Sequence, residues 1–224
     1  FEVDERIGAN GEIVKHLDET ALLETIKEIS EYKVESVAVC LLWSIVNGHH
    51  ERRIGELLEE HLPDIPYTLS HRLNPSIREY RRMISTAIDA SLKPLMRAYL
   101  LGLTGRLEEA GFRGRVLMVT ATGGVLDAQA VAEAPIHALG SGPAMAPIGG
   151  RYYAAIESQQ ETVVVADTGG TSYDVSLVRR GQVLSTKETW LGAPYLSDMT
   201  GFPSIDVKSI GAGGGSIAWV DQGG

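Results

Sequence analysis

The sequence contains a single cysteine, few aromatic residues and no long hydrophobic run. Cys40 has no second cysteine to pair with inside the chain, which is typical of a protein from the reducing cytoplasm. The longest apolar stretch, residues 36–45, covers about half of the roughly 20 residues that a helix needs to cross a bilayer. Twenty Lys and Arg against 29 Asp and Glu give a net charge of −9, which disfavours sequence-independent binding to nucleic acid or anionic lipid. We therefore predict a cytoplasmic protein with no nucleic-acid and no membrane partner.

The remaining composition is that of a folded globular chain. Hydrophobic residues make up 44% and charged residues 22% of 224 residues, so the length allows one large or two small domains. In the first third, Asp18 predicts the start of a helix that runs to about residue 32. A buried strand follows at residues 36–43, then an amphipathic helix at 49–61 and a second strand at 66–70. This alternation predicts α/β units with parallel strands.

A long helix is the strongest single pattern in the chain. Residues 76–79 have the Ser-x-x-Glu sequence of a capping box, and apolar residues continue at helical spacing to Leu107. Gly111 predicts the end of this helix, and Pro94 predicts a kink or a break within it.

The second half is richer in glycine and in β-branched residues. We expect a short strand at 116–119, a helix from Ser141 to about residue 159 with Pro143 in its first turn, and a strand at 162–166. A hairpin turning at Gly181 should join 174–178 to 182–185, and strands at 204–210 and 216–220 should flank the glycine-rich residues 211–215.

The segment from Val163 to Leu177 has the pattern expected of a phosphate-binding turn. A hydrophobic strand delivers Asp167 to its end, and Thr168, Gly169, Gly170, Thr171 and Ser172 then precede Asp174 and the next strand. Glycines allow close approach of the backbone to an anion, and successive N–H groups together with hydroxyls supply hydrogen-bond donors. The two aspartates would repel a bare phosphate, so a Mg²⁺ ion held by both is the natural bridge. An ordinary tight β-hairpin explains the same residues equally well.

Three ordered motifs resemble those of the hydantoinase A, 5-oxoprolinase and acetone carboxylase β-subunit family. They are residues 139–144 (Leu-Gly-Ser-Gly-Pro-Ala), residues 167–177 with the Asp-Thr-Gly-Gly-Thr-Ser-Tyr-Asp sequence, and residues 205–218 with the glycine cluster. Further similarity at residues 74–82 and 122–124 extends the resemblance over most of the chain.

The resemblance implies an α/β fold that forms part of a two-lobe, RNase H-like architecture of the actin-like ATPases. Residues 1–159 would then be the C-terminal part of the first lobe with the connecting helix, and residues 160–224 the β-rich start of the second. The turn from Thr168 to Ser172, together with Gly213 and Gly214, would bind ATP. Asp167 and Asp174 would be catalytic and would hold Mg²⁺.

The same resemblance implies the activity. We expect a subunit of an ATP-dependent hydrolase that phosphorylates the oxygen of a cyclic amide such as a hydantoin or 5-oxoproline, with a hydantoinase B-type partner subunit. The alternatives are the β-type subunit of an ATP-dependent ketone carboxylase acting on acetone or acetophenone, and an actin-like ATPase switch without a metabolic substrate. By this resemblance we expect the family's first phosphate loop and its adenosine-binding region to lie outside these 224 residues. The isolated chain should therefore bind ATP weakly or not at all and should lack ATPase activity.

Overall fold

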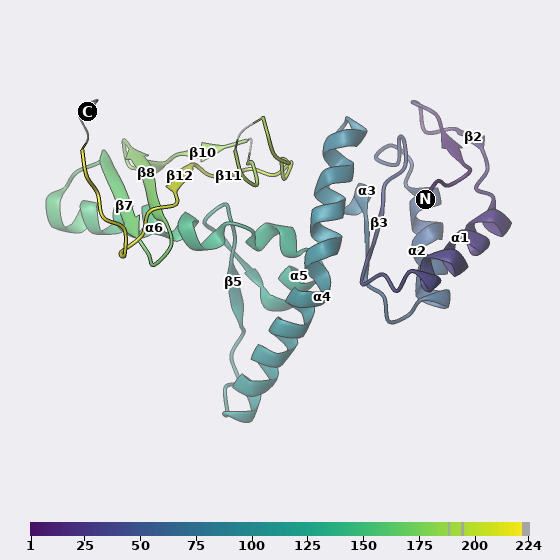
Figure 1. Ribbon diagram of the computed structural model, residues 1–224, viewed down its shortest axis with the longest axis horizontal. Helices are drawn as coiled ribbons and strands as arrows, with labels where there is room; N and C mark the ends of the chain where they lie inside the picture. The colour runs from purple at the N-terminus through teal and green to yellow at the C-terminus, as the bar shows by residue number, and fades with distance from the viewer. Residues whose placement is uncertain (188, 194, 221–224) are drawn as a thin grey trace. The chain divides into compact units, whose positions relative to one another are not determined.

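A computed structural model describes residues 1–187, 189–193 and 195–220 as a mixed α/β chain (Figure 1). It contains two compact units. Unit 1 consists of the described residues of Phe1–Met118, Leu126–Ile136 and Glu188–Phe202, and unit 2 of those of Val119–Val125, His137–Lys187 and Pro203–Gly224.

Unit 1 begins with the predicted α/β arrangement. After a short hairpin of β1 (Arg6–Ile7) and β2 (Ile13–Lys15) come α1 (Glu19–Glu31), β3 (Val37–Val39), α2 (His49–His61) and β4 (Tyr67–Leu69). The side chain of Asp18 accepts a hydrogen bond from the Ala21 N–H, which confirms the predicted helix cap. β3 and β4 are parallel, as predicted, because α2 provides the crossover between them. The core of this part is formed by Leu22, Ile26, Val39, Ile54, Leu57, Leu58 and Leu69.

The long helix of unit 1 differs from the prediction at its start. After α3 (Ser70–Leu73), α4 runs unbroken from Glu79 to Glu109 with Pro94 inside it, so of the two alternatives at Pro94 the break is wrong and the kink stays a prediction. The predicted capping box is also wrong. The residue before the helix is Arg78, at φ 78° and ψ 103°, and no side chain caps the first turn. A positive φ is uncommon for a residue other than glycine, and at Arg78 it turns the chain into α4 without a capping side chain.

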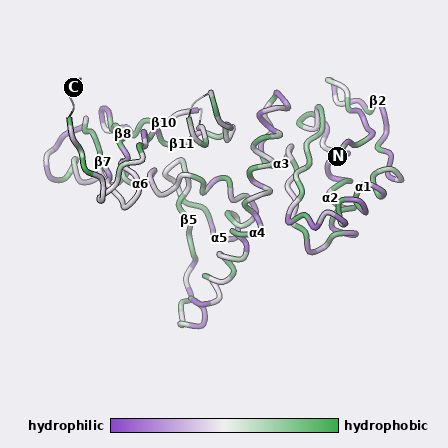
Figure 2. The backbone as a smooth tube through the Cα atoms, in the orientation of Figure 1, coloured by the Kyte–Doolittle hydropathy of each residue, from purple (hydrophilic) through white to green (hydrophobic). Residues whose placement is uncertain are grey.

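The buried side of α4 is polar. Figure 2 shows hydrophilic and hydrophobic residues mixed along this helix, which packs against β3, β4, α3 and α5 (Ala128–Glu133). Its most buried residues include Arg82, Ser85, Thr86, Asp89 and Lys93. By contrast, four of the apolar residues at helical spacing are 46–70% exposed, namely Tyr80, Met83, Leu95 and Tyr99.

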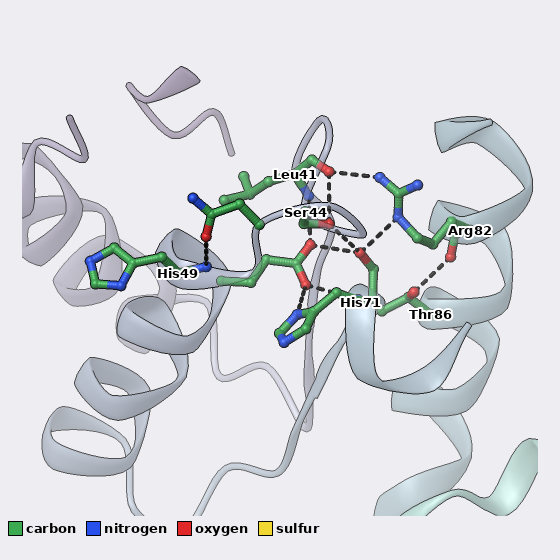
Figure 3. Close-up of polar contacts among 9 residues, drawn as sticks. Leu41, Ser44, His49, His71, Arg82 and Thr86 are labelled. Atoms are coloured by element: carbon green, nitrogen blue, oxygen red, sulfur yellow. Dashed lines mark hydrogen bonds and ion pairs between the residues drawn. The ribbon is translucent and has the colours of Figure 1, made fainter. Parts of the chain in front are cut away.

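A buried carboxylate, that of Glu51 on α2, lies among polar groups of α3 and of the loop after β3, which Arg82 of α4 also contacts (Figure 3). Glu51 is 0% exposed. Its Oε1 accepts hydrogen bonds from Leu41 N at 2.8 Å and Ser70 Oγ at 2.6 Å, and its Oε2 accepts from His71 N at 3.0 Å and is 2.6 Å from His71 Nδ1. Arg82 on α4 binds two of the same residues as Glu51. Its Nε donates to Ser70 Oγ at 3.0 Å, and its Nη2 donates to Leu41 O at 2.7 Å. Glu51 therefore joins α2 to the loop after β3 and to α3.

This arrangement makes the stability of unit 1 depend on pH. Burial alone would raise the pKa of Glu51, but the hydrogen bonds from His71, Ser70 and Leu41 outweigh it and hold the pKa below its ordinary value of 4.5. A carboxyl group with a lowered pKa stabilises the fold above its unfolded pKa and loses this contribution as the pH falls through the folded pKa. We expect the urea midpoint of the wild type to fall more steeply than that of Glu51→Gln between roughly pH 5 and pH 3. Parallel slopes for the two proteins would contradict this.

Two short strands and α5 connect this part to the second half of the sequence. β5 (Leu117–Val119) pairs with β6 (Val125–Asp127), and α5 is followed by the 3-10 helix η1 (Pro135–Ala138). None of the helices in the described part of the chain combines the length and the apolarity needed to cross a membrane.

The described residues of unit 2 form a small antiparallel sheet, a separate pair of short strands and a helix with a π-helical end. α6 (Ser141–Tyr153) continues as the π-helical turn η2 (Ala154–Ser158), in agreement with the predicted helix from Ser141. The sheet has the order β12 (Val207–Ile210), β8 (Tyr173–Arg179), β7 (Val163–Thr168), and β9 (Gln182–Val183) pairs with β8 through the predicted turn at Gly181. β10 (Ser185–Thr186) pairs separately with β11 (Ser204–Ile205).

One predicted strand is wrong. Residues 216–220 are irregular, and Ile217, Trp219 and Val220 are 77–88% exposed. Their β-branched and aromatic composition favours a strand, but a strand also needs a neighbour to pair with. Within the described residues the sheet has no strand beside them.

The two compact units do not divide at residue 159, because α6 packs against β7 and β8. Gly150 allows this contact, since a Cβ atom there would lie 2.4 Å from Val165 Cγ2. The assignment of residues 1–159 and 160–224 to the two lobes of a larger ATPase concerns the whole protein, and it stays a prediction.

Candidate functional site

The turn between β7 and β8 carries the two predicted aspartates at matching positions. β7 and β8 are antiparallel, and Asp167 is directly opposite Asp174 in their register. Directly opposed residues lie on the same face of a sheet, with Cβ atoms about 5 Å apart. Gly169 N donates to Ser172 O at 3.0 Å and closes the turn. The prediction that Asp167 lies at the end of a strand, with an antiparallel strand starting near Asp174, is therefore confirmed.

The two aspartates have different surroundings. Asp167 is exposed, whereas Asp174 is 7% exposed and accepts hydrogen bonds from two hydroxyl groups. Ser172 Oγ donates to Asp174 Oδ2 at 3.0 Å, and Ser209 Oγ on β12 donates to Oδ1. These contacts fix the carboxylate of Asp174, while Asp167 stays accessible to a ligand.

Ser209 was not among the residues predicted from the sequence. It reaches Asp174 because β12 is the other neighbour of β8 and Ser209 is opposite Asp174 in that pairing. A serine within a short strand gives no signal of its own, and only the register of the two strands reveals the contact.

The backbone of the turn faces solvent. Thr168, Gly169, Gly170 and Thr171 are exposed and Ser172 is half-buried, as predicted for a turn that is not part of a core. A Cβ atom at Gly170 would have no neighbour within 4 Å. Exposed N–H groups and hydroxyls in such a turn are the donors that an anion binds.

The second glycine segment lies directly against the first. Gly214 N donates to Gly169 O at 2.9 Å, and Gly213 N donates to Ser216 Oγ at 3.0 Å. A Cβ atom at Gly213 would lie 2.3 Å from Gly170 O, so only glycine allows this approach. The structure thus brings together the turn, both aspartates and the two predicted glycines of residues 211–215. That these residues bind ATP stays a proposal.

The two carboxylates at the turn, Asp167 and Asp174, fit Mg²⁺ better than a metal ion that needs three or more protein side chains. The described residues contain no group of three or more His, Cys, Asp or Glu that could hold a metal ion. Mg²⁺ commonly uses one or two carboxylates and completes its shell with phosphate and water oxygens. Asp167 supplies an open carboxylate for this purpose, and Asp174 lies opposite it with both oxygens already hydrogen-bonded.

We expect Gly213→Ala to disturb the turn. The added methyl group would meet the backbone of Gly170 and Thr171, which cannot rotate away as a side chain would. Overpacking of this kind costs about 1–3 kcal/mol of folding free energy, and it should be seen as a lower urea midpoint and faster amide exchange in β7 and β8.

Gly215→Ala is the matched control, because a Cβ atom there has no neighbour within 4 Å. The control should stay within about 0.5 kcal/mol of the wild type. Equal stability of the two variants would show that the close approach at Gly213 has no energetic role.

Comparison with family models gives two matches. The model described as hydantoinase/oxoprolinase matches residues 82–224, and the model of the hydantoinase/oxoprolinase N-terminal region matches residues 1–62. Among curated proteins, the chain is 34% identical to caprolactamase subunit alpha of Pseudomonas jessenii over 97% of this chain and 30% of that protein. It is 32% identical to the acetophenone carboxylase gamma subunit of Aromatoleum aromaticum over 99% of this chain and 30% of that protein. The chain spans about a third of the length of these relatives.

Solved structures show the same fold. The ATP-dependent caprolactamase of Pseudomonas jessenii matches with a TM-score of 0.80 and 32% identity, covering 98% of this chain and 31% of that one. The nucleotide-free structure of an acetone carboxylase matches with a TM-score of 0.81 at 24% identity over the same shares, so it supports the fold alone.

Proposed function

The chain belongs to the hydantoinase/oxoprolinase family, and on that premise we propose that the protein is a subunit of an ATP-dependent hydrolase of cyclic amides. The observation that supports an ATP site is the exposed turn from Thr168 to Ser172 between two opposed aspartates. The observation that favours a cyclic amide is the 34% identity to a subunit named caprolactamase. Because the chain spans about a third of such relatives, the activity is assigned to the whole protein.

Phosphorylation makes the amide reactive. An amide carbon is a poor electrophile. When the amide oxygen attacks the γ-phosphoryl group of ATP and ADP is released, the amide carbon becomes a better electrophile because its oxygen now carries a phosphate. Water then adds to the carbon, and the ring C–N bond breaks as the nitrogen takes up a proton, which leaves an acyl phosphate. A second water molecule hydrolyses this acyl phosphate to the carboxylic acid and phosphate. The net reaction consumes one ATP and two water molecules and yields a linear amino acid, ADP and phosphate.

This chain would bind the phosphate groups and hold the metal. The N–H groups of Gly170 and Thr171 and the hydroxyls of Thr168 and Thr171 would donate to phosphate oxygens, while Gly169 N keeps the turn closed. Asp167 and Asp174 would hold Mg²⁺, Asp174 through water. When bound, Mg²⁺ neutralises the charge of the transferring phosphoryl group. Ser172 and Ser209 would keep the Asp174 carboxylate oriented while the phosphates bind.

Two other activities compete with this one. The 32% identity to an acetophenone carboxylase subunit favours a ketone carboxylase, in which the enol oxygen of acetone or acetophenone would be phosphorylated instead. An actin-like ATPase without a metabolic substrate would use the same turn as a switch. In the two enzymes we propose a separate partner subunit, of the hydantoinase B type for the hydrolase, because both relatives are named as subunits. A cytoplasmic location completes the proposal.

Substrate-coupled ATP hydrolysis separates the three activities. The full-length protein with its partner subunit is assayed for ADP release with 5-oxoproline, hydantoin or caprolactam, with acetone or acetophenone plus bicarbonate, and with no added substrate. Stimulation by a cyclic amide together with a stoichiometric linear product supports the proposal. Stimulation only by ketone and bicarbonate, or full activity without any substrate, would overturn it.

A further inference from the structure

The parallel pair of β3 and β4 in unit 1 has two outer edges. Val37 N on β3 donates to Pro66 O at 3.0 Å, so the N–H and C=O groups of Val37 point toward β4. Successive residues of a strand direct these groups to opposite sides, and those of Ala38 therefore point to the outer edge of β3. By the same register, the C=O of Tyr67 points to the outer edge of β4. Within the described residues no third strand joins this pair.

The outer edge of β4 is closed by charged side chains. Lys93 on α4 is 5% exposed, and its Nζ donates to Tyr67 O at 2.7 Å. The cavity along this edge is lined by three basic and three acidic residues, namely Arg72, Lys93, Arg97, Glu59, Asp89 and Glu133. Charged side chains, lysine above all, are a common means of preventing a further strand from pairing. β4 therefore has the features of the last strand of a sheet.

The outer edge of β3 has the opposite character. A cavity of about 480 Å³ is lined by the six consecutive residues from Val37 to Leu42 and by apolar side chains that include Val3, Leu22, Ile26, Ile29 and Met83. Its charged residues all come from the N-terminal segment and are Glu2, Glu5 and Arg6. Ala38 is exposed, and its N–H and C=O have no hydrogen-bond partner in the part of the chain that the structure describes.

We propose that the outer edge of β3 pairs with a further β-strand of the same polypeptide, from outside these 224 residues. An open edge beside apolar side chains is a template for strand pairing, and two strands alone are only marginally stable in water. The length for such a strand is available, because this chain spans about a third of the curated relatives. The pairing is independent of the proposed ATP-dependent activity.

The surroundings of the edge also indicate what the added strand contains. Parallel sheets are covered on both faces, and their strands are apolar on both sides. On one side the new strand would face Leu22 and Ile26, which belong to the same core cluster as Val39. On the other side it would face Met83 of α4, which is 46% exposed in this structure. We therefore expect a nearly continuous apolar run of about five or six residues.

Hydrogen exchange with residue-level fragmentation tests the pairing on the full-length protein, purified without a partner subunit and measured over a range of concentrations. The Ala38 N–H should exchange about a hundredfold or more slowly than an unprotected amide, at a rate close to that of Val39, whose N–H points toward β4. Fast exchange at Ala38 beside slow exchange at Val39 would overturn the proposal. Protection of Ala38 that depends on dimer formation, or on addition of the partner subunit, would overturn the assignment to the same polypeptide.

Ala38→Pro tests the hydrogen bond itself. Proline has no N–H and is tolerated on an edge that faces solvent, but inside a sheet it removes a hydrogen bond between strands. Ala38→Pro should therefore lower the urea midpoint of the full-length protein clearly more than Ala38→Gly, which keeps the N–H at the same position. Equal midpoints of the two variants would show that no strand pairs with Ala38. The exchange measurement on the wild type decides the matter if Ala38→Pro does not fold.

Discussion

Asp167→Ala in the full-length protein should lower substrate-coupled ATP hydrolysis by about a hundredfold or more. Asp167 is the exposed carboxylate of the β7–β8 turn, and without it Mg²⁺ would lose its directly accessible protein oxygen. Asp174→Ala should cause a comparable loss, because Asp174 is opposite Asp167 in the sheet. The measurement is ADP release at saturating substrate, together with its dependence on Mg²⁺ concentration, which should shift to higher values in Asp167→Ala.

The control for this experiment is Asp206→Asn. Asp206 belongs to the same unit, and its carboxylate pairs with the exposed Lys208 at 2.8 Å, away from the turn. This variant should retain activity within a factor of two. Unchanged substrate-coupled hydrolysis in both alanine variants would contradict the assignment of the turn, whatever the stability of the proteins.

Glu51→Ala should lower the free energy of unfolding of unit 1 by about 3–5 kcal/mol. Four donors from Leu41, Ser70 and His71 would lose their acceptor in a buried site, and each unsatisfied buried donor costs about 1–3 kcal/mol before the surroundings relax. Arg82 would also lose part of its support, because it shares Ser70 Oγ with Glu51. The loss should appear as a lower urea midpoint and as faster amide exchange at the start of α4.

Glu56→Ala is a suitable control because Glu56 is on the same helix. Its side chain is 63% exposed and pairs with Arg53 at 3.0 Å, an arrangement that contributes less than about 1 kcal/mol. If Glu51→Ala and Glu56→Ala had the same small effect, the buried hydrogen bonds of Glu51 would not hold unit 1 together.

Elements with a local signal were predictable from the sequence. The bounds of α2 agree with the prediction, and Asp18 caps α1, because helical spacing and a capping side chain act within a few residues. The parallel pairing of β3 and β4 followed from the helix between them. The β7–β8 turn was predictable for the same reason, since its glycines and hydroxyls are consecutive in the sequence.

The features that were predicted wrongly, or not predicted at all, depend on contacts between distant parts of the chain. The start of α4 is set by the backbone of Arg78 and by the anchoring of Arg82, not by the hydroxyl of Ser76. The contact of Ser209 with Asp174 depends on strand register, and the hydrogen bonds to Glu51 come from two segments, the loop at Leu41 and α3 at Ser70 and His71. No periodicity in a single segment contains this information.

The polar interior of α4 constrains how this helix can be redesigned or can drift during evolution. A designer who followed hydropathy would place leucines at its buried positions, but a leucine at position 89 would leave Lys93, Thr68 and the Ile136 N–H without their common neighbour. A tolerated change there must replace several residues at once, so each single step crosses a less stable intermediate. Leu95 on the outward side is 70% exposed, so we expect substitutions there to act on stability independently of the buried groups. The helix thus has one side on which mutations are strongly epistatic and one on which they are nearly additive.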